Sequence, residues 1–118
     1  MIKGLKDNQV FIFGSNLAGR HAGGAARQAH EDFRAEWGVG EGLTGKCYAF
    51  PTLDENHQKR SDEDLKESVK KLWLTVVANH DKEFLLTKVG CGIAGYSENY
   101  MRDLFKGFPK NLIKPENW

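Results

Sequence analysis

Two glycine-rich segments, residues 14–24 and 90–95, contain the residue types that suit a phosphorylated ligand. Glycine allows backbone N–H groups to approach an anion closely, and a helix that begins after such a segment presents the positive end of its dipole. Each segment follows an apolar run and precedes residues with helical spacing. Because two segments share this context, we interpret them as a site for a diphosphate or a nucleotide diphosphate. The alternative is that their glycines only form turns.

Known phosphate-binding motifs do not account for these glycines. Residues 14–19 have the glycine spacing of a P-loop, but Arg20 and His21 stand where Lys and Ser/Thr are required. Residues 40–45 match the dinucleotide fingerprint in letters, yet they precede a predicted strand. Residues 90–95 follow a strand, but the chain after them is too short for the second half of a Rossmann fold. The sequence therefore predicts phosphate-binding loops outside both of these folds.

Few side chains within the two segments could act on a ligand. His21 is the candidate general acid or base, and a candidate ribose partner; the alternative is a solvated loop histidine. Asn16 offers a donor and an acceptor, which suits a pair of ribose hydroxyls. Cys91 has no neighbouring base in the sequence, so a small buried thiol is favoured over a nucleophile. Tyr96 directly follows the second segment, where its ring could pack on a ribose.

Residues outside the two segments are interpreted as structural. The remaining histidines, His30, His57 and His80, lack the spacing of metal ligands. No motif in the sequence indicates a metal or a cofactor. The stretch 52–60 is polar and is interpreted as a surface loop, in preference to a mobile lid built on Asp54, Glu55 and His57.

Apolar runs predict the strands that position these residues. Residues 9–13, 47–50 and 83–89 suit strands that are buried on both faces. Alanines at helical spacing after Gly24 predict a helix that lies close to the sheet, and a stripe from Leu65 to Val77 predicts another. Ser97 caps a short helix, and residues 112–113 form a possible final strand. This alternation predicts an α/β fold with three layers and a mostly parallel mixed sheet, in one domain spanning residues 1–118.

The composition excludes several classes of function. With 17 basic and 16 acidic residues the net charge is +1, which disfavours nucleic acid or an anionic membrane as the partner. No apolar run approaches the roughly 18 residues of a membrane helix. Two cysteines are too few for a disulfide framework and fit a reducing cytosol. We therefore expect a cytoplasmic protein whose partner is a small molecule; composition does not bear on its oligomeric state.

Three motifs in the glycine-rich segments point to a known family. They are Phe13-Gly-Ser-Asn16, His21-Ala-Gly-Gly-Ala-Ala26 and Lys88-Val-Gly-Cys-Gly-Ile-Ala-Gly-Tyr96. Together they resemble the ligand loops of macro domains, including small macro-like proteins of bacteria and phages. The resemblance spans roughly residues 10–105. It implies a three-layer α/β/α fold that binds ADP-ribose, with residues 16–26 at the distal ribose and 90–96 around the diphosphate. The predicted ligand-binding residues are Gly14, Ser15, Asn16, His21, Gly23, Gly24, Gly90, Cys91, Gly92, Ile93, Ala94, Gly95 and Tyr96.

The chain departs from typical macro domains in two respects. It begins only about ten residues before the first motif, so we expect an N-terminally truncated domain that lacks the aspartate by which the family recognises adenine. Ala94 stands where the branch that removes ADP-ribose from glutamate has an aspartate, and residues 51–54 lack that branch's lysine. We therefore expect no release of ADP-ribose from glutamate by that route.

The sequence predicts binding of ADP-ribose or a related nucleotide diphosphate, and leaves two alternatives. The first is a hydrolase that cleaves an ADP-ribosyl bond at the distal ribose, with Asn16 orienting the sugar and His21 as the candidate catalytic residue. The second is a bacterial or phage interaction protein that binds no nucleotide.

Overall fold

Five strands and three helices occupy residues 4–118, the part of the chain that the computed structural model describes. In chain order they are β1 (Gln9–Asn16), α1 (Gly24–Asp32), β2 (Gly42–Thr44), β3 (Cys47–Leu53), α2 (Asp62–Ala78), β4 (Glu83–Leu86), α3 (Glu98–Leu104) and β5 (Leu112–Ile113).

The strands form one mixed sheet in the order β2-β3-β1-β4-β5. The neighbouring strands β3, β1, β4 and β5 run parallel to one another, and β2 is antiparallel to β3. β1 lies at the centre, and residues 10–13 are buried on both of its faces, as the continuous apolar run predicts. The predicted α/β class with a mostly parallel mixed sheet is therefore confirmed.

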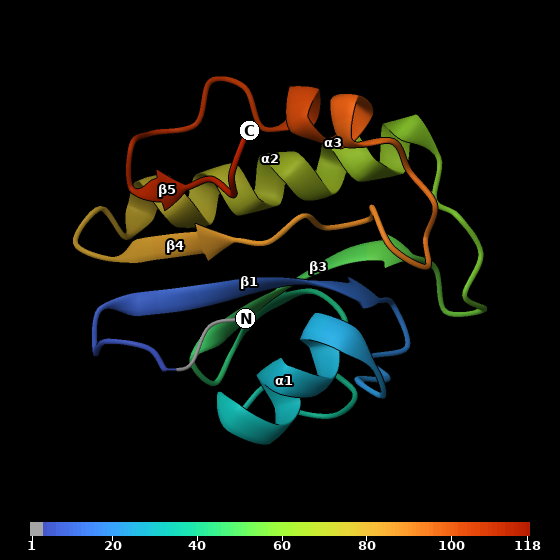
Figure 1. Cartoon of the computed structure of the whole chain (residues 1–118), viewed down its shortest axis with the longest axis horizontal. Coiled ribbons are helices and arrows are strands. Elements are labelled where there is room, and N and C mark those ends of the chain that lie inside the picture. Colours follow the sequence, from blue (N-terminus) through green and yellow to red (C-terminus); the bar gives the residue numbers. More distant parts are fainter. Residues whose placement is uncertain (1–3) are drawn as a thin grey trace.

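Helices cover both faces of the sheet, with α1 on one side and α2 and α3 on the other (Figure 1). Side chains of β1 alternate between two cores, because successive strand residues point to opposite faces. Phe11 and Phe13 pack with Ala26 and Ala29 of α1. Val10 and Ile12 belong to the larger core, which also contains Leu65, Leu72, Val76, Met101 and Phe105. The small alanine side chains allow α1 to lie close to the sheet.

Two strand ends differ from the predicted ones. The second strand was expected to stop at Pro51, yet β3 continues to Leu53. Proline is accommodated because β2 pairs only with residues 47–49 of β3, which leaves one side of the strand without a ladder there. The third strand ends at Leu86, before the predicted end at residue 89. The Thr87 hydroxyl donates to the Ile12 carbonyl oxygen at 2.8 Å, and the chain then turns away from the sheet.

The three helices begin in different ways. α2 and α3 have serine N-caps: the N–H of Asp64 donates to Ser61 Oγ, and the N–H of Tyr100 donates to Ser97 Oγ, both at 3.1 Å. The Ser97 cap is the one that the sequence predicts. α1 instead begins after Gly23, and no side chain accepts a hydrogen bond from its first turn. Its first N–H groups are consequently left without a cap.

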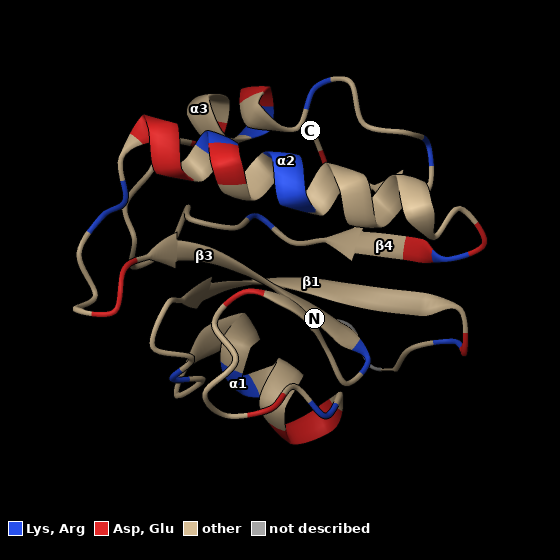
Figure 2. Ribbon diagram, turned by 180° about the vertical axis from the view of Figure 1, so that it is seen from behind, with Lys and Arg blue, Asp and Glu red and all other residues tan. Residues whose placement is uncertain are grey.

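Most charged side chains lie on the helices and loops; β4 begins with Glu83, and β1 and β3 carry no charged residue (Figure 2). An acidic first turn marks the start of α2, with Asp62, Glu63 and Asp64 in succession. No helix within residues 4–118 combines the length and the apolar character needed to cross a membrane.

Candidate functional site

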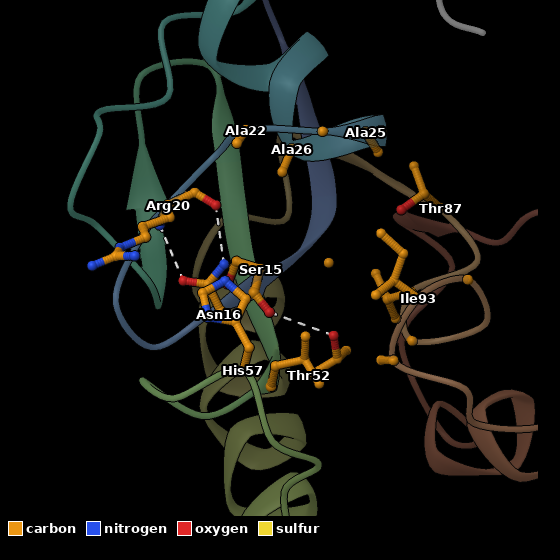
Figure 3. Close-up of a pocket in the computed structure, with 18 of the residues that line it drawn as sticks. Ser15, Asn16, Arg20, Ala22, Ala25, Ala26, Thr52, His57, Thr87 and Ile93 are labelled. Atoms are coloured by element: carbon orange, nitrogen blue, oxygen red, sulfur yellow. Dashed lines mark hydrogen bonds between the residues drawn. The ribbon is translucent and has the colours of Figure 1, made fainter.

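A cleft of about 550 Å³ opens where β1, β3 and β4 end (Figure 3). Its walls come from the end of β1, the start of α1, the end of β3 with the loop after it, and the segment after β4. This is the carboxyl edge of the sheet, where ligands bind in open α/β folds. The structure therefore brings both glycine-rich segments to one cavity.

Nine of the thirteen predicted ligand-binding residues line this cleft, and the other four do not. The nine are Gly14, Ser15, Asn16, Gly23, Gly24, Gly90, Gly92, Ile93 and Ala94. His21, Cys91, Gly95 and Tyr96 are absent from its walls.

The start of α1 presents three free N–H groups to the cleft. The first hydrogen bond of the helix runs from the Arg27 N–H to the Gly23 carbonyl oxygen at 3.2 Å. The N–H groups of residues 24–26 consequently have no acceptor in the described part of the chain. Their residues all line the cleft, and no acidic side chain occupies the first turn. The positive end of the α1 dipole is thus open to an anion.

The segment after β4 presents a second set of free N–H groups. Two bonds close its turn: the N–H of Gly95 donates to the Gly92 oxygen at 3.0 Å, and that of Tyr96 donates to the Gly90 oxygen at 2.9 Å. Within residues 4–118, the N–H groups of residues 92–94 find no acceptor. Gly90 has φ +78°, and a Cβ atom there would lie 3.0 Å from the Tyr96 ring. Glycine is therefore required where the segment turns.

Asn16 lines the cleft, but its amide holds the backbone of its own loop. Its Nδ2 donates to the Arg20 carbonyl oxygen, and its Oδ1 accepts from the Arg20 N–H, both at 3.0 Å. The dashed lines in Figure 3 show this pair of bonds. The sequence predicts Asn16 as a ribose contact; in the structure its amide instead shapes the loop that leads into α1.

His21 lies outside the cleft, in contrast to its predicted role as acid or base at a ligand. It is 1% exposed and packs edge-on against Phe13. Its Nε2 donates to the Glu36 carbonyl oxygen at 2.9 Å, and its Nδ1 has no partner among the described residues. Burial lowers the pKa of His21, and the hydrogen bond to Glu36 opposes this shift. The imidazole is held in an aromatic cluster with Trp37 and His30, which keeps it away from the cavity.

Cys91 and Tyr96 are not among the residues that line the cleft. The Cys91 Sγ donates to the Val89 carbonyl oxygen at 3.5 Å, and burial raises the pKa of this thiol. A raised pKa disfavours the thiolate that a nucleophile needs. The Tyr96 hydroxyl accepts from the Arg60 N–H at 2.9 Å and lies 3.2 Å from the Thr52 carbonyl oxygen. Tyr96 thus joins two loops.

Ten residues that are not among the thirteen predicted ones also line the cavity: Arg20, Ala22, Ala25, Ala26, Thr52, Leu53, His57, Thr87, Lys88 and Val89.

One wall of the cleft, the loop after β3, was missed in the sequence interpretation. The sequence predicts a polar surface loop over residues 52–60; in the structure Thr52, Leu53 and His57 of this stretch line the cavity. The signal was the position of this loop in the chain. It follows a strand parallel to β1, so it must emerge at the same edge of the sheet.

The residues that line the cavity include no Asp or Glu, so no carboxylate opposes an anion there. Arg20 and Lys88 are the cationic residues among them. Lys88 Nζ forms an ion pair with Glu98 at 3.1 Å, and Figure 3 shows the Arg20 guanidinium directed away from the cavity. Within residues 4–118, no group of three or more His, Cys, Asp or Glu side chains is placed to hold a metal ion.

Comparison of the chain with family models, with curated proteins and with solved structures finds no match in any of the three. The geometry of the cleft and the three motifs therefore carry the functional argument.

Proposed function

We propose that the protein binds a nucleotide diphosphate of the ADP-ribose type in this cleft. The observation that supports the proposal is the convergence of two sets of three free N–H groups, residues 24–26 and 92–94, on one cavity without a carboxylate. Each set is a suitable donor for one phosphate group, because anions bind readily to helix N-termini and to successive backbone N–H groups.

The size of the cavity and the motif resemblance favour a nucleotide over a free phosphate ion. A volume of about 550 Å³ lies within the range of sites for small organic ligands. The motifs that resemble macro domains occur in the two segments that supply the free N–H groups. In this proposal the diphosphate lies between the start of α1 and residues 92–94.

Binding is proposed in preference to hydrolysis. The hydrolase alternative rests on His21 as the catalytic group, and this side chain is buried behind the cleft with one nitrogen bonded to Glu36. The interaction-protein alternative gives no reason for six N–H groups to be left free around one cavity.

Calorimetric titration tests the proposal with a series of ligands. We expect ADP-ribose and ADP to bind and adenosine and ribose to show no heat, because the N–H groups supply most of the attraction. At a concentration of 100 times its dissociation constant, ADP-ribose should also stabilise the fold by about 2.7 kcal/mol. Equal affinity for adenosine and ADP-ribose would contradict the proposal.

Gly92→Val provides a local test of the site. A Cβ atom at Gly92 meets nothing within 4 Å, so the variant should fold normally. The new side chain would stand where the backbone approaches a phosphate, and we expect at least a tenfold loss of affinity for ADP-ribose. Gly4→Val is the matched control, since a Cβ atom there also meets nothing within 4 Å and Gly4 lies outside the cleft walls. Unchanged affinity in folded Gly92→Val would move the site elsewhere.

A further inference from the structure

The loop after β3 holds His57 in an unusual backbone conformation. His57 has φ +61°, in the left-handed region that favours glycine and asparagine. Left-handed backbone in a residue with a Cβ atom is strained, and such strain clusters at functional sites. Histidine adopts this conformation more often than most residues with a Cβ atom, although glycine adopts it without strain.

The conformation of the loop is set by the Asp54 carboxylate. Its Oδ1 accepts hydrogen bonds from the N–H groups of Asn56 at 2.8 Å and Gln58 at 2.9 Å. The backbone closes the same turn, because the His57 N–H donates to the Asp54 oxygen at 3.1 Å. A bridge between Leu53 and Lys59 joins the two ends of the loop.

A second set of contacts ties this loop to the segment after β4. Lys59 Nζ donates to the Gly95 carbonyl oxygen at 3.2 Å and lies 5.0 Å from the centre of the Tyr96 ring. The loop that carries His57 is thus fastened to the segment that presents the N–H groups of residues 92–94. These contacts connect the loop of His57 to the segment that contains those N–H groups.

His57 is the histidine that lines the cleft, and an imidazolium can donate a hydrogen bond to an anion. No hydrogen bond or ion pair engages the His57 ring within the described residues, and Figure 3 shows it beside Asn16 at the cavity. Arg20 and Lys88 are the charged residues of the other walls, and its own loop adds Asp54, Glu55 and Lys59. His21 is buried and does not line the cavity.

We propose that His57 is a ligand-binding residue, whose imidazolium donates a hydrogen bond to a phosphate oxygen of the nucleotide diphosphate. The inference rests on the proposed function, because it assigns a further contact in the same cleft. In this interpretation the strained histidine persists because asparagine or glycine, which would fit the backbone better, cannot supply the charge. Protonated His57 would place a positive charge at the wall of a cavity that no Asp or Glu lines.

His57→Asn tests this inference, because asparagine adopts left-handed backbone readily. We expect the melting temperature of the free protein to rise by about 2–5 °C as strain is relieved. Affinity for ADP-ribose at about pH 6 should fall roughly tenfold, and at about pH 8 it should differ little. The wild type should bind more tightly as pH falls between these values, and the variant should show a flatter profile. His80→Asn, at an exposed turn outside the cleft, is the matched control and should behave as the wild type.

The outcomes separate this inference from the proposed function. If ADP-ribose binds the wild type and His57→Asn with equal affinity and the same pH profile, the proposed role of His57 is overturned, and the binding site is unaffected. A lower melting temperature in His57→Asn with unchanged pH dependence would show a purely structural role and would also overturn it. Absence of ADP-ribose binding to the wild type would overturn both proposals.

Discussion

At the scale of single residues, the cleft relies on backbone N–H groups, and nearby side chains set the backbone that presents them. Asn16 illustrates this: both of its polar atoms bond to the backbone of Arg20. The residue type and position of Asn16 were enough to predict it as a candidate for the site. Its hydrogen-bond partner was not predictable, because the amide group can bond equally well to a sugar hydroxyl or to a peptide group.

His21 shows a similar limit of sequence interpretation. A histidine between two glycine-rich stretches suits a catalytic loop, but whether its ring faces a cavity or a core depends on packing against Phe13 and Trp37. Those contacts depend on how the loop folds back over the sheet, and no residue pattern in the sequence reveals them.

Burial of His21 predicts that the protein loses stability in mild acid. Its pKa is lowered in the folded state, so the unfolded chain binds the proton more readily. The contribution of His21 is therefore full above about pH 6.5 and is lost as pH falls toward the lowered pKa. Urea unfolding of the wild type and of His21→Phe between about pH 5 and 7.5 checks this. The free energy of unfolding should depend less on pH in the variant, and parallel curves would contradict the prediction.

At the scale of elements, the helices follow their sequence signals more closely than the strands do. α2 begins at its capping serine and buries the predicted apolar positions Leu65, Leu72 and Val76. Strand ends depend on neighbouring strands: β3 continues through Pro51 because no ladder forms on one side of it there. The residues around Pro51 do not show which strands will pair with it, so the end of β3 could not be predicted.

The uncapped start of α1 predicts a conflict between stability and binding. Gly23→Asp should cap the helix, because Gly23 has an extended backbone and open space around its Cβ position. We expect a gain in stability of about 0.3–1 kcal/mol. ADP-ribose affinity should fall at least tenfold, since a carboxylate then competes for the N–H groups of residues 24–26. Denaturant unfolding and calorimetry measure the two effects, with Gly23→Ala as the control; tighter binding in Gly23→Asp would exclude the start of α1 from the site.

At the scale of the whole molecule, contacts between loops assemble the cleft. The Tyr96 hydroxyl connects the segment after β4 to the backbone of Arg60, across 36 positions of sequence. The α/β class and the edge of the sheet that holds the site were predictable from alternating strands and helices. The position of the loop after β3 at the same edge also follows from this alternation, but its contacts with Gly95 and Tyr96 are long-range and were not predictable.

Tyr96→Phe measures how much this connection matters. The variant retains the ring beneath Lys59 but leaves the Arg60 N–H without its hydroxyl acceptor. We expect a loss of about 1 kcal/mol of stability, and weaker ADP-ribose binding as the segment after β4 loosens. Tyr100→Phe is a suitable control, because it removes a hydroxyl that bonds to the exposed Asp62 carboxylate. Unfolding curves and titrations that do not distinguish the two variants would show that the Tyr96 hydroxyl has no special role.

The two outer strands of the sheet are also its shortest, with three residues in β2 and two in β5. Exposed strand edges recruit strands from other chains, and long flat edges are the most prone to do so. β2 contains Gly42 at φ +101°, and Pro115, which has no N–H, follows closely after β5. The native sheet therefore offers only a few residues as a template for cross-β growth. We expect fibril formation to start from unfolded chains, so that any ligand that stabilises the folded state also slows aggregation.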